Sequence, residues 1–244
     1  MGTDPQKLGS VPNFEILTEL GLVPTWRLRA RAGADSAPED AEARAVRIAR
    51  LEWRDFAADV DACVACGLAR SRKKSVPGVG DAHAEWLLVG EAPGSEEDAK
   101  GEPFVGQAGK LLDNMLAALG MKRGENVYIA NVLKCRPPNN RTPEPREIGA
   151  CRPYLDRQIA LIGPKLIVAL GKSAATTLLD NDATVASLRG RLHRYRGVPL
   201  VVTYHPAYLL RNLPDKAKAW EDLLFARRTL HGAAAADDLV AGGR

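Results

Sequence analysis

Three polar side chains that can do chemistry, Glu91, Asn131 and His205, come at or just after the ends of short apolar runs. A carboxylate can orient or deprotonate a water molecule and stabilise positive charge that develops beside it. An amide offers donors and an acceptor together, and a neutral imidazole can donate a hydrogen bond. A fourth run is followed by Lys172 and Ser173 at a predicted helix start, which suits a phosphate group. Together these residues predict a functional site at the ends of the apolar runs.

The apolar runs alternate with helical patterns, and both must position these side chains. The predicted strands cover residues 86–89, 127–130, 166–170 and 198–203. The predicted helices cover about residues 43–60, 109–119, 144–162, a segment from 172, and 215–230. Continuous apolar strands separated by helices indicate a parallel sheet covered on both faces. We therefore predict an α/β fold of three layers, α/β/α, with a central four-stranded parallel sheet. Ligands bind beyond the carboxyl ends of such strands, where the polar residues fall.

The four cysteines form a second constellation. Cys63 and Cys66 make a Cys-x2-Cys pair, and Cys135 and Cys151 follow later in the chain. Two pairs with no cysteine left over suggest four thiolates on one metal centre. The spacing does not separate zinc from a 4Fe–4S cluster, and four buried inert thiols are the plainer alternative. Because Cys63 precedes the sheet, a metal centre would tie the segment before the sheet to the loop after the second predicted strand. We therefore expect the centre to be structural rather than to carry out redox chemistry.

The length and net charge of the chain limit its domain organisation and its possible partners. The chain has 244 residues and a net charge of +4, which permits a nucleic-acid partner but does not argue for one. We expect a loosely ordered N-terminal extension and linker over 1–45, one domain over 46–231, and a flexible tail over 232–244. No targeting or membrane-spanning segment is visible, so we expect the protein in the cytoplasm. We also expect it to be a monomer.

Four segments together resemble the family 4 uracil-DNA glycosylases. They are GEAPGSEEDAKGEPFVGQAGKLLDNML (90–116), NVLKCRPPNNRTPEPREIGAC (131–151), LIVALGKSAA (166–175) and TYHPAYLLRN (203–212). The resemblance spans about residues 50–230 with the motifs in order. It implies a glycosylase-like fold, monofunctional hydrolysis of the bond between uracil and its sugar in DNA, and base excision repair. It also implies a 4Fe–4S cluster on Cys63, Cys66, Cys135 and Cys151.

The resemblance implies that Glu91 is the catalytic carboxylate, and His205 would bind the uracil oxygen as the base departs. Excision requires a base flipped from its stack or taken from a single strand, and the sequence does not say which DNA is preferred. A related group lacks the carboxylate of the first motif, and Glu91 argues against that assignment. A sister group traps uracil through a histidine in a basic insertion, which does not follow Phe104.

Four residues are expected to bind uracil. Phe104 would stack on the base, although it could instead anchor its loop in the core. Asn131 could satisfy the adjacent carbonyl and N–H of uracil and reject cytosine, whereas a turn cap is the alternative. By resemblance, Glu97 would lie against the C5 position and exclude the methyl group of thymine. Ala92 is placed beside them in the same motif.

The segment Tyr208, Leu209, Leu210 and Arg211 puts an apolar wedge beside a cation, which suits the gap left by a flipped base. A turn that packs on the sheet is the alternative. Lys172 and Ser173 would bind another phosphate. Further basic residues near these loops would contact the DNA backbone or simply form a solvated face; they are Arg70, Arg72, Lys73, Lys74, Lys134, Arg136, Arg141, Arg189, Arg191, Arg194 and Arg196.

Two readings from other classes stay open. A non-catalytic iron–sulfur module that binds DNA or senses damage would need no water-activating carboxylate, so Glu91 separates it from an enzyme. A nucleotide hydrolase with a zinc site would act on free nucleotides.

Overall fold

The computed structural model describes residues 40–241, so residues 1–39 of the extension expected over 1–45 and residues 242–244 lie outside the described part, whereas residues 41–45 belong to a helix. The sheet contains β1 (Val79–Gly80), β2 (Trp86–Gly90), β3 (Val127–Asn131), β4 (Leu166–Leu170), β5 (Leu192–Tyr195) and β6 (Val198–Thr203). The strand order is β1-β3-β2-β4-β6-β5. The four inner strands β3, β2, β4 and β6 pair in parallel, which confirms the predicted parallel sheet.

The predicted sheet of four strands was too small, because the structure adds one antiparallel strand at each edge. The strand β1 has only two residues, one of them glycine, and no apolar run marks it. The strand β5 reads Leu-His-Arg-Tyr, and two of its four residues are exposed. Edge strands of this kind carry the polar residues that sequence patterns assign to loops.

The helices are α2 (Ala41–Ala49), α3 (Trp53–Ala62), α4 (Ser95–Lys100), α5 (Gln107–Ala118), α6 (Pro145–Ile162), α7 (Lys172–Leu179), α8 (Val185–Leu188), α9 (Pro206–Leu209) and α10 (Asp215–Ala241), with short 3-10 turns at Gly67–Arg70 and Pro138–Asn140. The single helix expected over 43–60 is two helices, α2 and α3. The helix α10 continues past residue 232 to Ala241, and flexibility of the tail stays a prediction.

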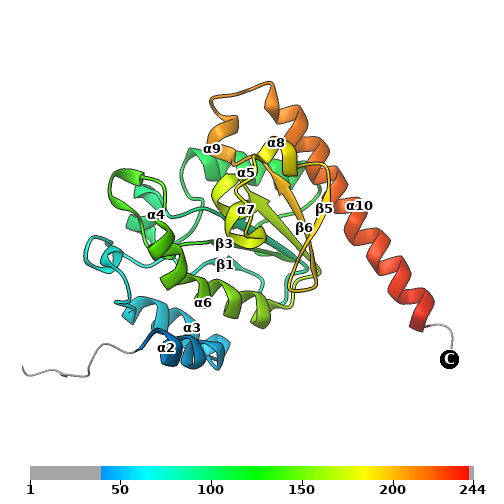
Figure 1. Cartoon of the computed structure of the whole chain (residues 1–244). Helices are drawn as coiled ribbons and strands as arrows, with labels where there is room; N and C mark the ends of the chain where they lie inside the picture. The colour runs from blue at the N-terminus through cyan, green and yellow to red at the C-terminus, as the bar shows by residue number, and fades with distance from the viewer. Residues whose placement is uncertain (1–39, 242–244) are drawn as a thin grey trace, which may run out of the picture. The chain divides into compact units, whose positions relative to one another are not determined.

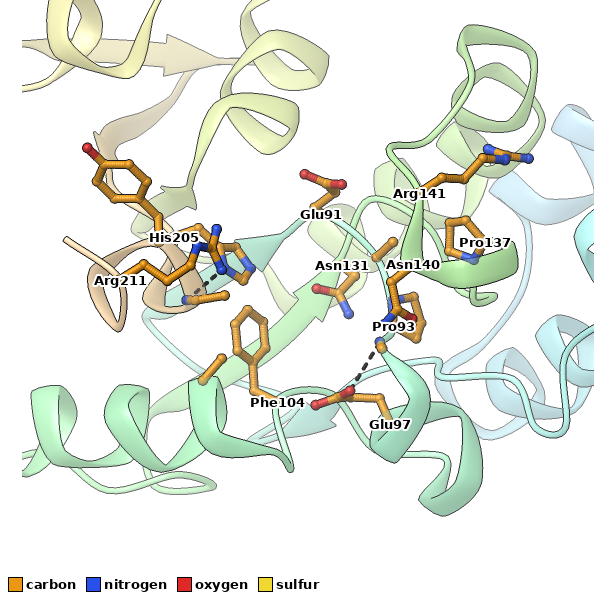
Figure 2. A pocket seen from close by; sticks show the side chains of 15 residues that line it. Glu91, Pro93, Glu97, Phe104, Asn131, Pro137, Asn140, Arg141, His205 and Arg211 are labelled. Atoms are coloured by element: carbon orange, nitrogen blue, oxygen red, sulfur yellow. Dashed lines mark hydrogen bonds between the residues drawn. The ribbon is translucent and has the colours of Figure 1, made fainter.

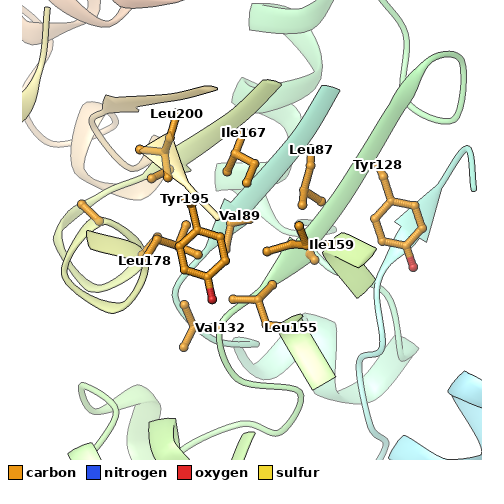
Figure 3. Packing of buried hydrophobic residues seen from close by; sticks show 14 of the residues in the cluster. Leu87, Val89, Tyr128, Val132, Leu155, Ile159, Ile167, Leu178, Tyr195 and Leu200 are labelled. Carbon is orange, nitrogen blue, oxygen red and sulfur yellow. The ribbon is translucent and has the colours of Figure 1, made fainter. Parts of the chain in front are cut away.

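Alternate side chains of the inner strands pack into two separate clusters, so the sheet is covered on both faces (Figure 1). One face packs against α6, α7 and α8; Figure 3 shows Leu87, Val89 and Ile167 there beside Leu155 and Ile159 of α6. The other face packs against α5 and α10. Beyond α6, the helices α2 and α3 form a smaller cluster around Phe56 and Tyr154. These layers confirm the α/β/α architecture and bring the four parallel strand ends to one edge.

Candidate active site

A cavity of about 520 Å³ lies at the carboxyl ends of the parallel strands. Figure 2 shows the side chains of Glu91, Phe104, Asn131 and His205 arranged around one space, although they come from different segments of the chain. Ala92 and Glu97 also line it, so all six residues predicted for catalysis and uracil binding meet in one cavity. The structure therefore places the site at the edge of the sheet where the sequence predicted it.

The amide of Asn131 lies at the back of this cavity. Asn131 ends β3, pairs with Gly90 in the parallel register, and is 2% exposed. Its Oδ1 atom is buried and has no hydrogen-bond partner among residues 40–241. A Cβ on Gly90 would lie 2.4 Å from this oxygen and 2.6 Å from Cζ of Phe104, so only glycine allows both side chains to close over the strand. An unpaired buried polar atom that lines a cavity marks a place for a ligand.

The ring of Phe104 is held by an unusual backbone. Phe104 has φ of 54°, in the left-handed region, and is 5% exposed. Arg123 donates from its two terminal nitrogens to the carbonyls of Pro103 and Phe104, both at 2.8 Å. A Cβ on Gly109 would lie 1.8 Å from the Phe104 carbonyl oxygen, so the first turn of α5 can pass this close to Phe104 only with glycine at this position. Phe104 is thus anchored in the core and also lines the cavity, and its stacking on a base stays a prediction.

Glu97 fastens the loop that carries Phe104. Its carboxylate accepts hydrogen bonds from the backbone N–H groups of Gly94, Val105 and Gly106 at 3.1, 2.9 and 3.2 Å. Glu97 also lines the cavity, so its expected part in excluding thymine stays a prediction. The sequence gives no sign of this contribution to the loop, because the three N–H groups come from two separate turns.

His205 faces the cavity as a neutral donor. Its Nδ1 accepts a hydrogen bond from the backbone N–H of Ala207 at 3.1 Å, which leaves the proton of a neutral ring on Nε2. Burial lowers the pKa of His205 to about 4, and the charge of Arg211 acts in the same direction. The ring stacks on Phe104, with centroids 5.3 Å apart. At neutral pH this group can donate a hydrogen bond from Nε2 without carrying a charge.

We expect His205 to remain neutral well below its ordinary pKa of 6.5, because burial disfavours the charged ring. A histidine NMR titration should show the Nε2–H tautomer at pH 7 and a protonation midpoint near the lowered value of about 4. The variant His205→Gln assigns the signal by removing it. A midpoint at or above the ordinary value, or a proton on Nδ1, would contradict this assignment.

Glu91 lies directly after β2, and its carboxylate is held from α7. Ser173 Oγ donates to Glu91 Oε2 at 2.7 Å. Ser173, expected at a phosphate, therefore also orients the predicted catalytic carboxylate. Its neighbour Lys172 is exposed and pairs with Asp182 at 2.9 Å. Phosphate contact by these two residues stays a prediction.

The turn after β6 corrects one of the predicted DNA contacts. Leu209 is 1% exposed, so it packs inside the protein and cannot serve in a wedge at the surface. Leu210 is 41% exposed and Leu213 is 60% exposed. Tyr208 stacks on Tyr204 and donates from its hydroxyl to Asp215 at 2.7 Å. Arg211 lines the cavity together with Tyr208. The helical turn α9 turns Leu209 inward, which the residue order alone did not reveal.

The loop between β3 and α6 adds two cavity residues that the sequence did not point to, Pro137 and Asn140, and brings in Arg141, which was expected near the DNA backbone. Pro137, Asn140 and Arg141 line the cavity, and Figure 2 shows them on the side opposite His205. Arg141 forms a two-pronged ion pair with Glu147, with contacts of 2.9 and 2.6 Å. The run Pro-Pro-Asn-Asn was the available signal, since asparagines with positive φ shape the loop here.

All four cysteines line one small second cavity. They are free thiols from three parts of the chain, before the sheet, after β3 and within α6. Arg72 donates to Cys135 Sγ at 2.9 Å, Arg44 donates to Cys63 Sγ at 3.4 Å, and the backbone N–H of Lys134 donates to Cys151 Sγ at 3.3 Å. Burial raises the pKa of Cys135 and raises the pKa of Cys151 to about 12. The Arg72 guanidinium and the Lys134 N–H lower the pKa of the thiols that they contact, but burial outweighs them. A bound metal ion displaces the thiol protons and offsets this effect of burial. The donor set fits a metal centre.

Comparison with known proteins adds the family context. Residues 77–224 match the sequence profile of the Uracil DNA glycosylase superfamily. A type-4 uracil-DNA glycosylase of Archaeoglobus fulgidus is 47% identical over 164 residues, 64% of this chain and 82% of the relative. Those of Sulfurisphaera tokodaii and Thermotoga maritima are both 46% identical, covering 67% and 65% of this chain and 78% and 83% of the relatives. Among residues 40–241, no helix is long and apolar enough to cross a lipid bilayer.

Proposed function

The chain belongs to the uracil DNA glycosylase superfamily and, within it, to the type-4 uracil-DNA glycosylases, and from this premise we propose that it hydrolyses the N-glycosidic bond of uracil in DNA. The product is an abasic site, as in monofunctional base excision. The observation that carries the proposal is the buried amide of Asn131, which lines the cavity and whose Oδ1 has no hydrogen-bond partner in the described part of the chain. Uracil presents an N–H beside a carbonyl, and one amide can satisfy both.

Each of the cavity residues has a different role in the proposed reaction. Phe104 provides an apolar face for the flipped base, while His205 donates from Nε2 to a uracil oxygen. When the bond between the sugar carbon and the base nitrogen breaks, its electron pair leaves with uracil, and the His205 hydrogen bond strengthens as negative charge develops. Glu91 stabilises the positive sugar and accepts a proton from the water whose oxygen bonds to the sugar carbon.

A labelled oligonucleotide with one uracil tests this function directly. We expect alkali to break the strand at that position after incubation with the protein, and not in oligonucleotides with thymine or cytosine there. No breaks, from protein that binds the same DNA, would support the non-catalytic binding module instead. Release of base from free nucleotides alone would support the nucleotide hydrolase.

We further propose that Cys63, Cys66, Cys135 and Cys151 hold a 4Fe–4S cluster. The four thiols line one cavity, yet no three His, Cys, Asp or Glu side chains among residues 40–241 are grouped to hold a single metal ion. Four cysteines can hold either zinc or a 4Fe–4S cluster, and the choice of the cluster rests on the resemblance of the motifs. The cluster would tie the segment before the sheet to β3 and α6 and supply structural cross-linking.

The variant Cys66→Ala should lose iron, sulfide and visible absorbance, because three ligands remain for a cluster that needs four. A loss of about 3 kcal/mol would lower Tm by roughly 10 °C for a chain of this size. Val64→Ala is the matched control, since Val64 lies between the two cysteines and is 82% exposed. Metal analysis that found one zinc and no iron in the wild-type protein would contradict the cluster.

Leu210 is the residue that we propose as the wedge in double-stranded DNA, with Arg211 beside it for phosphate. We expect Leu210→Ala to slow excision from duplex DNA by about tenfold and from single strands by less than about twofold, because only the duplex must be unstacked. Leu192→Ala, on β5, is the control, since Leu192 is 46% exposed. Equal losses on both substrates would contradict this role.

A further inference from the structure

Lys134 is a lysine buried directly behind the candidate active site. It follows β3 and is 1% exposed. Its Nζ donates to the backbone carbonyl oxygen of Asn131 at 2.9 Å and also to Oε1 of Gln158. A buried ammonium group is costly unless hydrogen bonds and nearby negative charge stabilise it. A plain core position would carry an apolar side chain, so the contacts of this lysine need an explanation.

The contacts of Lys134 join the active site to the cysteine cavity. Its backbone N–H donates to Cys151 Sγ at 3.3 Å, and Cys135 is the next residue. Its carbonyl accepts a hydrogen bond from the N–H of Val76 at 2.8 Å. The residue is therefore held through its backbone by the cysteine loop, while its side chain reaches back to Asn131.

The far end of the lysine is fixed by a second buried group. Gln158 of α6 is 0% exposed, and its Nε2 donates to the Pro77 carbonyl at 2.7 Å and to the Tyr128 hydroxyl at 3.2 Å. Its Oε1 is thereby directed at the ammonium group. The chain of contacts runs from the sheet through Gln158 and Lys134 to the carbonyl of Asn131. At the other end, Asn131 Oδ1 has no partner of its own, so backbone placement must aim the amide.

We propose that Lys134 is a positioning residue for base recognition, which holds the backbone of Asn131 so that the amide meets the flipped base. The inference rests on the proposed function. Lys134 also connects the cysteine loop to the active site, because it forms hydrogen bonds with both Cys151 and Asn131. Lys134 was grouped with the basic residues expected near DNA, and its burial excludes that role.

The variant Lys134→Met keeps the length of the side chain and removes its donors. We expect kcat/KM for uracil excision to fall about tenfold and inhibition by free uracil to weaken by a similar factor. Affinity for uracil-free DNA should stay within about twofold. Tyr195→Phe is the matched control, because it removes a hydroxyl from a buried tyrosine that donates to Asp156 and takes no part in the contacts of Lys134 and Gln158. The control should excise uracil at the wild-type rate.

A double-mutant cycle separates positioning from a general loss of stability. In an Asn131→Ala background, Lys134→Met should change kcat/KM by less than about twofold, because the group it positions is gone. Lys134→Gln, a shorter neutral side chain, should repeat the loss in kcat/KM and serves if the methionine variant does not fold. Equal losses in both backgrounds, or unchanged uracil inhibition, would overturn the proposal. If the wild-type protein releases no uracil, the proposed function fails instead.

Discussion

Replacing Glu91 with glutamine should lower the rate of uracil release by about 10²- to 10⁴-fold, the range that a positioned acid or base contributes. Glutamine keeps the shape of the side chain, and its carbonyl oxygen can still accept the hydrogen bond from Ser173 Oγ. What is lost is the negative charge that stabilises the sugar and the site that accepts the proton from water. Single-turnover base release from a uracil oligonucleotide measures the effect.

Binding should separate this chemical loss from a loss of substrate. We expect the affinity of Glu91→Gln for uracil-containing DNA to stay within about threefold of the wild type, since the carboxylate contributes to the transition state. Glu102→Gln is the matched control because Glu102 is an exposed carboxylate in the loop before Phe104. Near-normal excision by Glu91→Gln would remove Glu91 from the mechanism and favour a DNA-binding module in which cleavage belongs to another group.

The variant Asn131→Ala should reduce kcat/KM for uracil by about 100-fold, which corresponds to two lost hydrogen bonds of roughly 1.4 kcal/mol each. Although Asn131 is 2% exposed, stability should change little, because its Oδ1 has no hydrogen-bond partner to lose among residues 40–241. A parallel measurement of kinetics and thermal unfolding therefore distinguishes recognition from folding. A turn cap would behave in the opposite way, with reduced stability and nearly normal kinetics.

Asn114→Ala is the control for this prediction, because Asn114 is exposed on α5 and lines a groove away from the active-site cavity. The control should leave both excision and unfolding close to the wild type. If Asn131→Ala retained at least about a third of the wild-type kcat/KM, the amide would not read uracil. The proposal that Lys134 positions it would then fail as well.

The two sites are linked by a short segment, which bears on how the cysteine centre could affect excision. Asn131 ends β3 in the active-site cavity, and Cys135 lines the cysteine cavity four residues later. Lys134 bridges the two through its side chain and its backbone. A centre held by the four cysteines can therefore be structural and still influence recognition, since it fixes the loop that aims the amide.

The pattern of apolar runs determined the inner sheet and the edge where ligands bind. Each inner strand is buried on both faces, so it reads as a continuous apolar run that needs no tertiary information. The residues that follow these runs, Glu91, Asn131 and His205, therefore meet in the cavity as predicted. The motifs pointed to Phe104, and the spacing pointed to the four cysteines. The structure places Phe104 with the other site residues around the active-site cavity and the cysteines around the second cavity.

Tertiary structure alone decided the features that depend on partners far apart in the chain. The edge strands β1 and β5 exist because longer neighbours pair with them. Leu209 and Leu210 are identical neighbours, yet the turn α9 buries one and exposes the other. Lys134 looks like a surface cation in sequence, but the fold buries it and supplies Gln158, 24 positions away, as a hydrogen-bond partner. Local patterns record which residues are apolar, but hydrogen-bond partners across the fold decide what each polar residue does.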